Sequence, residues 1–281
     1  KDKPLIFAFQ ANIYAVIVAK ILKSSIVTRS NSAPQGWSQN FIKNKIYKII
    51  IKLANDVMVN SLDFKKIINK KFNIKPKCIY NPFDKNFIKQ KLFSKNEKIN
   101  FFKKGYINII SIGRLKDQKD HLTSLKAINI LKPDLKVKMI IVGKGENKFL
   151  LEKYININKL NHKVKLAGYK KNPYPFIKKS DIVLLSSKYE GLPNILLEAQ
   201  FLKKYIISTN CPTGPREILL NGRAGDLVEI GDYKKIAYLI NNYKKNRKNI
   251  SKKIDIGLKN FNRFDYNINC KKYLEFVLNN F

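Results

Sequence analysis

The stretch YINIISIGRLKDQK, from Tyr106 to Lys119, combines a continuous apolar run with a glycine and a polar loop. Residues 107–112 are rich in isoleucine and end at a turn signal, which favours a strand buried on both faces of a sheet. Gly113 allows the tight turn that ends such a strand. Arg114 and Lys119 then share one loop, where a planar fork and a point charge suit a diphosphate.

Short β-rich runs of this kind alternate with helical patterns along the chain, which predicts parallel sheets with helices on both faces. The polar, lysine-rich stretch between residues 84 and 104 predicts a linker with room for a short helix. The expected strands cover residues 5–9, 25–29, 56–60, 77–80, 107–112, 137–142, 164–166, 182–186 and 205–208. The expected helices cover residues 11–22, 39–53, 63–72, 121–131, 146–156, 173–179, 195–202, 215–220 and 232–246.

The charge of the chain is extreme, with a formal net value of +36, but of its 56 basic residues only six are arginine. Surfaces that read nucleic acid usually include arginine forks, whereas here lysine rises together with isoleucine and asparagine. That pattern is typical of drift towards AT-rich codons, so we expect no nucleic-acid partner. An anionic membrane surface remains a candidate partner, through the lysine clusters at residues 43–52, 65–77 and 244–253.

Cysteine and histidine are too few and too scattered to predict a disulfide framework or a metal site. The three cysteines form no CxxC pair, and His121 and His162 match no ligand spacing, which leaves an exposed or capping role for each histidine. The longest apolar stretch, residues 5–22, is interrupted by polar residues and is interpreted as a strand and a helix. We therefore expect a cytoplasmic protein with a possible peripheral position on the cytoplasmic face of the inner membrane.

A second motif, Glu190-Gly191-Leu192-Pro193-Asn194-Ile195-Leu196-Leu197-Glu198, follows the strand expected at residues 182–186. Because a helix begins near Pro193 or Asn194, the backbone amides of residues 191–195 and the positive helix end favour an anion. Two carboxylates are poor phosphate ligands but good acceptors for sugar hydroxyls. The segment therefore suits a nucleotide sugar, with a capping or surface glutamate as the alternative interpretation of Glu198.

A third motif, Cys211-Pro212-Thr213-Gly214-Pro215-Arg216-Glu217-Ile218, follows the strand expected at residues 205–208. Proline and glycine favour a sharp loop there, and Pro215 begins a helix. Two interpretations stay open. The motif is either another phosphate- or substrate-facing turn at the same edge of the sheet, or a plain loop that precedes a helix.

Taken in order, these motifs resemble the large family 4 of retaining glycosyltransferases, which have the GT-B fold of two Rossmann-like doubly wound domains. The segments Ile141-Val142-Gly143-Lys144-Gly145 and Leu166-Ala167-Gly168-Tyr169 are similar to that family's strand–turn signatures. The resemblance is strong over residues 107–229 and looser over residues 5–82. The second and third motifs are similar to those of bacterial enzymes that build surface polysaccharides and lipid-linked glycans.

The resemblance also implies a division of the chain. Residues 1–83 would be part of an acceptor-side domain, 84–105 the linker, 106–263 the nucleotide-sugar-binding domain, and 264–281 a helix that crosses back to the N-terminal domain. The family's glycine-rich N-terminal loop and histidine-bearing stretch have no counterpart near the start, and the first residue is Lys1. We therefore expect a truncated N-terminal domain that is the less stable half.

For the site, the resemblance implies that Arg114 and Lys119 neutralise the donor diphosphate as it leaves. Glu190 would hold hydroxyls of the transferred sugar and Glu198 those of the ribose. With two cations and a helix N-terminus to neutralise charge, neither a metal nor another cofactor is expected. The other donor-binding residues implied are Gly113, Gly168, Tyr169, Gly191, Leu192, Asn194 and Ile195, of which Gly168 and Tyr169 would lie by the base.

The function implied is a retaining glycosyltransferase that moves a hexose or N-acetylhexosamine from a nucleotide-diphosphate sugar, with UDP the favoured nucleotide. The acceptor would be a glycan or lipid-linked molecule in surface polysaccharide synthesis. One alternative is a GT-B nucleotide-sugar epimerase, which would share the fold and the ligand. Another is a basic protein that binds nucleic acid or lipid without catalysis, although its tyrosines are scattered rather than interleaved with basic residues.

Overall fold

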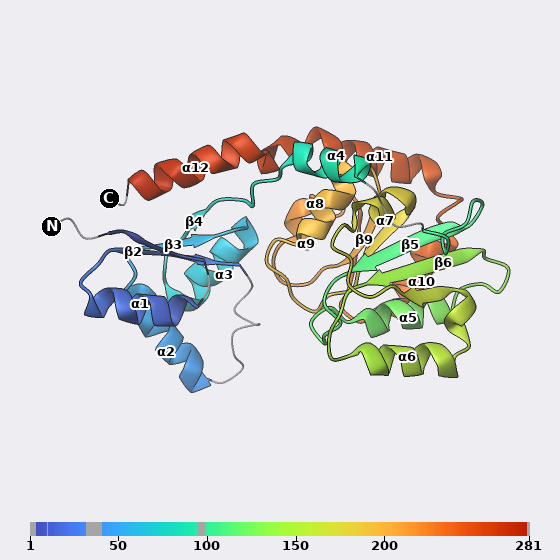
Figure 1. Cartoon of the computed structure of the whole chain (residues 1–281), viewed down its shortest axis with the longest axis horizontal. Helices are drawn as coiled ribbons and strands as arrows, with labels where there is room; N and C mark the ends of the chain where they lie inside the picture. The colour runs from blue at the N-terminus through green and yellow to red at the C-terminus, as the bar shows by residue number, and fades with distance from the viewer. Residues whose placement is uncertain (1–3, 10, 32–40, 95–98, 280–281) are drawn as a thin grey trace.

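Two parallel β-sheets, each accompanied by helices, form the two halves of the chain (Figure 1). The computed structural model describes residues 4–9, 11–31, 41–94 and 99–279. The N-terminal sheet has the strand order β1-β2-β3-β4, and the C-terminal sheet has the order β10-β9-β8-β5-β6-β7. All the strand pairs are parallel. The α/β architecture predicted from the alternating runs is therefore confirmed.

The elements follow the predicted order closely. The N-terminal half contains β1 (Ile6–Ala8), α1 (Asn12–Ile21), β2 (Ile26–Ser30), α2 (Phe41–Lys52), β3 (Asp56–Val59), α3 (Leu62–Phe72) and β4 (Lys77–Cys78). The strands of the C-terminal half are β5 (Ile107–Ile112), β6 (Val137–Val142), β7 (Val164–Leu166), β8 (Ile182–Leu185), β9 (Tyr205–Thr209) and β10 (Asp226–Val228). The remaining helices are α4 (Lys85–Phe93), α5 (His121–Asn129), α6 (Lys148–Ile157), α7 (Tyr174–Lys179), α8 (Asn194–Phe201), α9 (Pro215–Ile218), α10 (Tyr233–Asn241), α11 (Arg247–Lys259) and α12 (Tyr266–Leu278).

Strand β5 is buried on both faces, as its isoleucine-rich sequence predicts. Successive side chains of a strand point to opposite faces, so Ile107 and Ile109 pack with α5, α6 and α10 on one face. Ile110 packs with α7 and α8 on the other face. The C-terminal sheet thus has an apolar core on each side, which holds the loops at its strand ends in place.

The segment between the two sheets contains helix α4, and it packs against the C-terminal half. Phe83, Ile88 and Ile99 belong to the same buried cluster as Phe176 of α7. Helix α4 contacts α7, and Figure 1 shows it above the C-terminal sheet. Burial of these three apolar side chains makes the segment part of the covering layer of that sheet.

Two elements of the C-terminal half were missed by the sequence prediction, strand β10 and helix α11. The helix predicted at residues 232–246 instead ends at Asn241 and is followed by α11. The lysine-rich sequence of α11 hides its packing face, which consists of Ile250 and Gly257. A Cβ at Gly257 would lie 2.9 Å from Gln200 Nε2, so this glycine lets α11 approach α8 closely.

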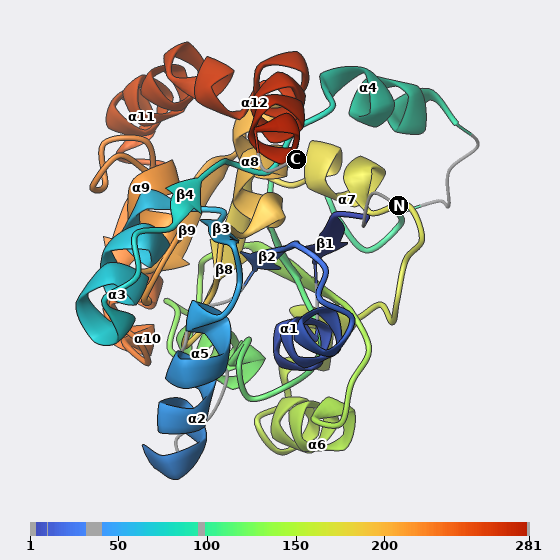
Figure 2. The ribbon, with the colours of Figure 1, turned by 90° about the vertical axis from the view of Figure 1, so that its left-hand side faces the viewer.

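Helix α12 crosses from the C-terminal half back over the N-terminal sheet (Figures 1 and 2). Phe83 N donates to Phe264 O at 2.9 Å just before the crossing, and Arg29 Nε on β2 donates to the Tyr273 hydroxyl of α12 at 2.6 Å. In both views α1 and α2 lie on the side of the N-terminal sheet away from α12. Across the described ranges, the structure contains no helix that is both long and apolar enough to span a bilayer.

Candidate functional site

A cleft lies between the two halves of the chain, at the carboxyl ends of strands from both sheets. Two adjoining cavities of about 850 and 500 Å³ occupy it. Both are lined by Phe9, Arg29 and Asn31 from the N-terminal half and by Lys119 and Glu190 from the C-terminal half. Ligands of doubly wound sheets bind beyond the carboxyl ends of the strands. The cleft is therefore the candidate site.

An ion pair between Lys119 and Glu190 lies in the cleft. Lys119 Nζ donates to Glu190 Oε1 at 2.6 Å, and Ser187 Oγ donates to the same oxygen at 2.6 Å. The Thr213 hydroxyl donates to the backbone carbonyl of Glu190. Because Glu190 is only 6% exposed, its charge requires the lysine to compensate it. A Cβ at Gly113 would lie 3.1 Å from Lys119 Cδ, so this glycine makes room for the lysine side chain.

The loops that carry these two residues come from different strands and are tied together by hydrogen bonds. Gln118 Nε2 donates to Tyr189 O at 3.0 Å, and Lys188 N donates to Gln118 O at 2.8 Å. Ser186 Oγ donates to Lys119 O at 3.1 Å. Residues about 70 positions apart are therefore fixed in one frame, which gives the Lys119–Glu190 pair a defined position.

Arg114 differs from Lys119 in its surroundings. Its side chain is exposed at the wall of the smaller cavity. It forms no ion pair with a carboxylate among the residues that the structure describes. Arg114 is thus available to an incoming anion, whereas Lys119 already forms an ion pair with Glu190. An ammonium has three N–H donors, so Lys119 can serve an anion and Glu190 together.

Gly191 brings the two halves into direct backbone contact. A Cβ at this position would lie 1.8 Å from Asn31 O, so no other residue fits without movement of the backbone. Gly214 supports the same loop from behind, since its φ is +83° and a Cβ there would lie 2.2 Å from Gly191 O. These two glycines explain why the motif around Glu190 can form one wall of the cleft.

The residues after Gly191 also lie at the boundary between the halves. Leu192 and Asn194 line the larger cavity, and Asn81 Nδ2 donates to Asn194 Oδ1 at 2.7 Å. Ile195 is buried in the C-terminal core. Of the predicted donor-binding residues, Leu192 and Asn194 therefore join Gly191 in the cleft, while Ile195 supports them from below.

Three further predicted residues, Gly168, Tyr169 and Glu198, line neither cavity. Tyr169 is exposed and its ring lies 5.6 Å from Lys144 Nζ. Gly168 has a φ of +69°, and its carbonyl accepts from Gly143 N at 2.9 Å. Glu198 lies in α8, where burial raises the pKa of its carboxyl to about 7. The structure thus keeps these residues outside the two cavities that hold Arg114, Lys119 and Glu190.

Arg29 of β2 was missed by the sequence prediction. The residue is 9% exposed and lines both cavities. Its Nε donates to the Tyr273 hydroxyl and its Nη2 to Asn81 Oδ1, each at 2.6 Å. One signal could have found it, because Arg29 is the only arginine before Arg114 and follows an apolar run at a strand end.

Glu217 of the third motif faces the N-terminal half and lines neither cavity. Its carboxylate accepts from Leu62 N at 3.0 Å and Asp63 N at 3.2 Å, at the start of α3. It also accepts from the Tyr80 hydroxyl at 2.5 Å. Glu217 therefore bonds two free amides of a helix end and joins the halves.

The expectation that His121 is exposed or capping is also wrong, since its ring is buried at the start of α5. The ring Nδ1 lies 3.1 Å from Ser111 Oγ. Burial lowers the pKa of His121 to about 4, so the imidazole is neutral at physiological pH. A neutral ring behind strand β5 supports the loop that begins at Gly113.

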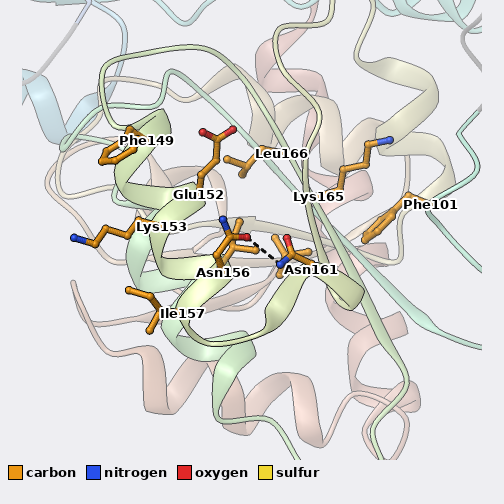
Figure 3. A pocket seen from close by; sticks show the side chains of 11 residues that line it. Phe101, Phe149, Glu152, Lys153, Asn156, Ile157, Asn161, Lys165 and Leu166 are labelled. Carbon is orange, nitrogen blue, oxygen red and sulfur yellow. Dashed lines mark hydrogen bonds between the residues drawn. The ribbon is translucent and has the colours of Figure 1, made fainter.

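A separate hollow of about 790 Å³ lies on the outer edge of the C-terminal half (Figure 3). Its walls come from α6, β7 and Phe101, and Asn161 Nδ2 donates to Asn156 Oδ1 at 3.0 Å within it. None of the predicted site residues lines it. The chemistry-bearing side chains are gathered in the cleft instead.

Comparison with known proteins agrees with this architecture. The family model of glycosyl transferases group 1 matches residues 93–257. An uncharacterized glycosyltransferase of Methanocaldococcus jannaschii is 39% identical over 181 residues, which are 62% of this chain and 44% of that protein. An N-acetylgalactosamine-N,N'-diacetylbacillosaminyl-diphospho-undecaprenol 4-alpha-N-acetylgalactosaminyltransferase of Campylobacter jejuni is 28% identical over 239 residues, which are 82% of this chain and 63% of that protein.

Solved structures resemble the whole chain. Anabaena HepE in complex with UDP-glucose superposes with a TM-score of 0.83 at 20% identity, over 98% of this chain and 78% of that chain. TarM of S. aureus superposes with a TM-score of 0.71 at 20% identity, over 90% of this chain and 50% of that chain. Since the family model covers more than half of the sequence, the chain belongs to the glycosyl transferases group 1 family, and its fold is GT-B.

Proposed function

We propose that this chain is a retaining glycosyltransferase of the family 4 type, which uses a UDP-sugar without a metal ion. The observation that carries the proposal is the position of Arg114 and the Lys119–Glu190 pair in one cleft between two parallel sheets. The sugar transferred would be a hexose or N-acetylhexosamine. The acceptor would be a glycan or a lipid-linked molecule in surface polysaccharide synthesis.

The chemistry of the three side chains supports transfer. As the bond from the sugar to the diphosphate breaks, negative charge collects on the leaving phosphate oxygens. Arg114 can pair with them through its planar fork, and Lys119 can do so while it still bonds Glu190. Fixed cations in a cleft partly shielded from water stabilise such charge without the reorganisation that water would need. The acceptor hydroxyl would attack the face from which UDP departs, and its proton would pass to the departing phosphate oxygen.

The names of relatives support the choice of substrates. HepE binds UDP-glucose in its crystal structure, and the C. jejuni relative transfers N-acetylgalactosamine to a diphospho-undecaprenol-linked sugar. A staphylococcal relative, 32% identical over 177 residues, acts in capsular polysaccharide biosynthesis. The chain spans 44 to 63% of the length of the M. jannaschii, C. jejuni and staphylococcal relatives, so donor, acceptor and activity are proposed here.

Calorimetry with UDP in the presence of EDTA tests the donor half of the proposal. Arg114→Ala should weaken UDP binding by about 1.5–3 kcal/mol, the range for hydrogen bonds to charged groups. Lys248→Ala, an exposed lysine of α11, is the matched control and should bind UDP normally. Binding that needs Mg²⁺ or Mn²⁺ would contradict metal independence, and equal losses in both variants would reduce the site to nonspecific charge.

A second assay follows a labelled sugar from the UDP-sugar. Recovery of the label on a glycan acceptor, with the anomeric configuration retained, supports the proposal. Label that stays on UDP with altered stereochemistry would favour the epimerase alternative. Salt-sensitive retention of nucleic acid without UDP binding would favour a non-catalytic basic protein instead.

We also propose that helix α2 contacts an anionic membrane surface. Ile46 and Ile49 are 49 and 57% exposed and lie on one helical face, and lysines are interspersed along the same helix. Leu53, directly after the helix, is 48% exposed. An amphipathic helix of this kind suits the boundary of an anionic bilayer. Co-sedimentation with phosphatidylglycerol vesicles should fall for Ile46→Ser with Ile49→Ser but not for the control Phe149→Ser on α6. Equal retention of all three proteins would refute the contact.

A further inference from the structure

The guanidinium of Arg29 is a buried cation without a carboxylate partner. It forms no ion pair among the described residues. Its two hydrogen-bond acceptors, the Tyr273 hydroxyl and Asn81 Oδ1, are neutral. An arginine in a protein stays protonated, and a buried charge is costly unless it is compensated. The site therefore favours an anion that is supplied by a ligand.

Arg29 is held rigidly, as a recognition residue needs to be. Besides its two hydrogen bonds, the guanidinium carbon lies 5.6 Å from the ring centroids of both Phe9 and Tyr273. These contacts come from β2, α12, the segment after β4 and the strand end beside β1. Five N–H donors belong to a guanidinium, and two are used by these partners. No further acceptor among the described residues bonds the guanidinium, so its remaining donors can reach a ligand in the cavities that the side chain lines.

The wall next to Arg29 is apolar. Phe7 and Phe9 from the β1 region and Leu274 and Val277 of α12 line the larger cavity, which Arg29 shares with them. Phe9 is 52% exposed and Leu274 is 59% exposed. We call these four residues the apolar wall. A hydrocarbon chain laid against them would remove exposed apolar surface from water.

The apolar wall distinguishes this site from that of the donor. Arg29 and Lys119 line both cavities, but Arg114 lines only the smaller one, which lacks Phe7, Leu274 and Val277 of the apolar wall. A nucleotide sugar carries phosphates but no hydrocarbon chain. An anion joined to a hydrocarbon, as in a lipid phosphate, would use both Arg29 and the apolar wall.

We propose that Arg29 binds a phosphoryl oxygen of the acceptor and that the apolar wall holds the hydrocarbon attached to that phosphate. The inference rests on the proposed function and narrows its acceptor to a lipid phosphate or diphosphate. Arg29 is then a specificity-determining residue that orients the acceptor and takes no part in the bond changes. Tyr273 and Asn81 position its guanidinium.

The test is calorimetry with farnesyl diphosphate in the presence of saturating UDP, which occupies Arg114 and Lys119. Arg29→Gln should weaken farnesyl diphosphate binding about ten- to a hundred-fold, as expected for loss of a hydrogen-bonded charge. The exposed Arg223→Gln is the matched control, and it should bind both ligands as the wild type does. UDP binding by Arg29→Gln reports that the variant is folded.

Two more probes separate the anion from the hydrocarbon. Inorganic diphosphate should bind at least tenfold more weakly than farnesyl diphosphate, and farnesol should bind equally to wild type and Arg29→Gln. Leu274→Ser should weaken binding of farnesyl diphosphate but not of inorganic diphosphate. Equal affinity for the two diphosphates would overturn the lipid assignment, and unchanged binding by Arg29→Gln would overturn the site.

The failure of this inference can be told from failure of the proposed function. If UDP binds and the sugar is transferred, but Arg29→Gln binds farnesyl diphosphate as tightly as the wild type does, only the inference is wrong. If UDP does not bind, the proposed function is wrong. Farnesyl diphosphate binding that depends on Arg29 without added UDP would then still identify a lipid phosphate site.

Discussion

The two halves of the chain differ in how much apolar surface they bury and in what they present to the cleft. The two clusters of the C-terminal sheet contain 23 and 21 buried residues, whereas the clusters of the N-terminal sheet contain four each among the described residues. Helices α1 and α2 also expose large side chains such as Ile21 and Ile49. The proposed donor groups thus stand on the more strongly packed half, and Arg29 stands on the less strongly packed one.

This contrast suggests that the two halves have different roles in the proposed reaction. Residues that stabilise charge in a reaction must be held in place, and the C-terminal core holds Lys119 and Glu190 through the tied loops of β5 and β8. The N-terminal half meets that frame through a few contacts, chiefly those of Gly191, Asn194 and Glu217.

The largest effect concerns local stability. Because strands β1 to β3 rest on small clusters, their amides should exchange with solvent at least about a thousandfold faster than those of β5, β6 and β8. Hydrogen exchange measured by mass spectrometry on the purified chain checks this. Similar protection of both sheets would mean that the halves unfold as one cooperative unit.

Loss of the lysine in the cleft should have the next largest effect. Lys119→Ala removes a cation from the proposed diphosphate site and leaves Glu190 buried without its partner, so sugar transfer should fall about a hundred- to a thousandfold. Lys253→Ala is a matched control, because Lys253 pairs with Asp226 at 2.8 Å outside the cleft. That variant should keep its activity, and comparable losses in both would show that the effect is general destabilisation.

Contact between the halves can be weakened without touching the proposed donor groups. Glu217→Ala removes the acceptor of two amides of α3 and of the Tyr80 hydroxyl. We expect sugar transfer to fall about tenfold while UDP affinity stays the same. The reason is that loss of these bonds should weaken the contact between the two halves by roughly 1–2 kcal/mol. Parallel kinetics and calorimetry check the split. A loss of UDP affinity as large as the loss of transfer would place Glu217 in the donor site.

The smallest effect is a dependence of stability on pH. Burial raises the pKa of Glu198 from 4.5 to about 7 in the folded chain, so the folded state binds an extra proton between those values. The free energy of unfolding is therefore highest below pH 4.5 as far as Glu198 is concerned, and it falls as the pH rises through 7. At pH 8 the free energy of unfolding of Glu198→Gln should therefore exceed that of the wild type by about 1–2 kcal/mol, so the variant should unfold at a higher temperature. At pH 4 the two proteins should unfold at the same temperature. A gain that is independent of pH would show that Glu198 does not titrate in this range.

Much of the C-terminal half could be predicted from the sequence. The limits of β5, β6 and β7 agree with those expected from apolar runs that end at turn signals. The parallel arrangement then requires the loops after β5 and β8 to share one edge, which brings Lys119 and Glu190 together. Local patterns suffice here because a buried strand and the turn that follows it are written in consecutive residues.

Which residues of the N-terminal half face the cleft depends on how segments far apart in the sequence pack together. Arg29, Asn81 and Tyr273 come from separate segments, and nothing local marks them as partners. The sequence of the third motif is equally compatible with a ligand beside Glu217 and with the contact that the structure shows, which is to the start of α3. Helix α11 was hidden because lysines on its exposed face mask the few residues that pack. Contacts between distant segments depend on which faces of the helices and sheets pack together. The sequence pattern shows which face of an element is apolar, but it does not show which other element covers that face.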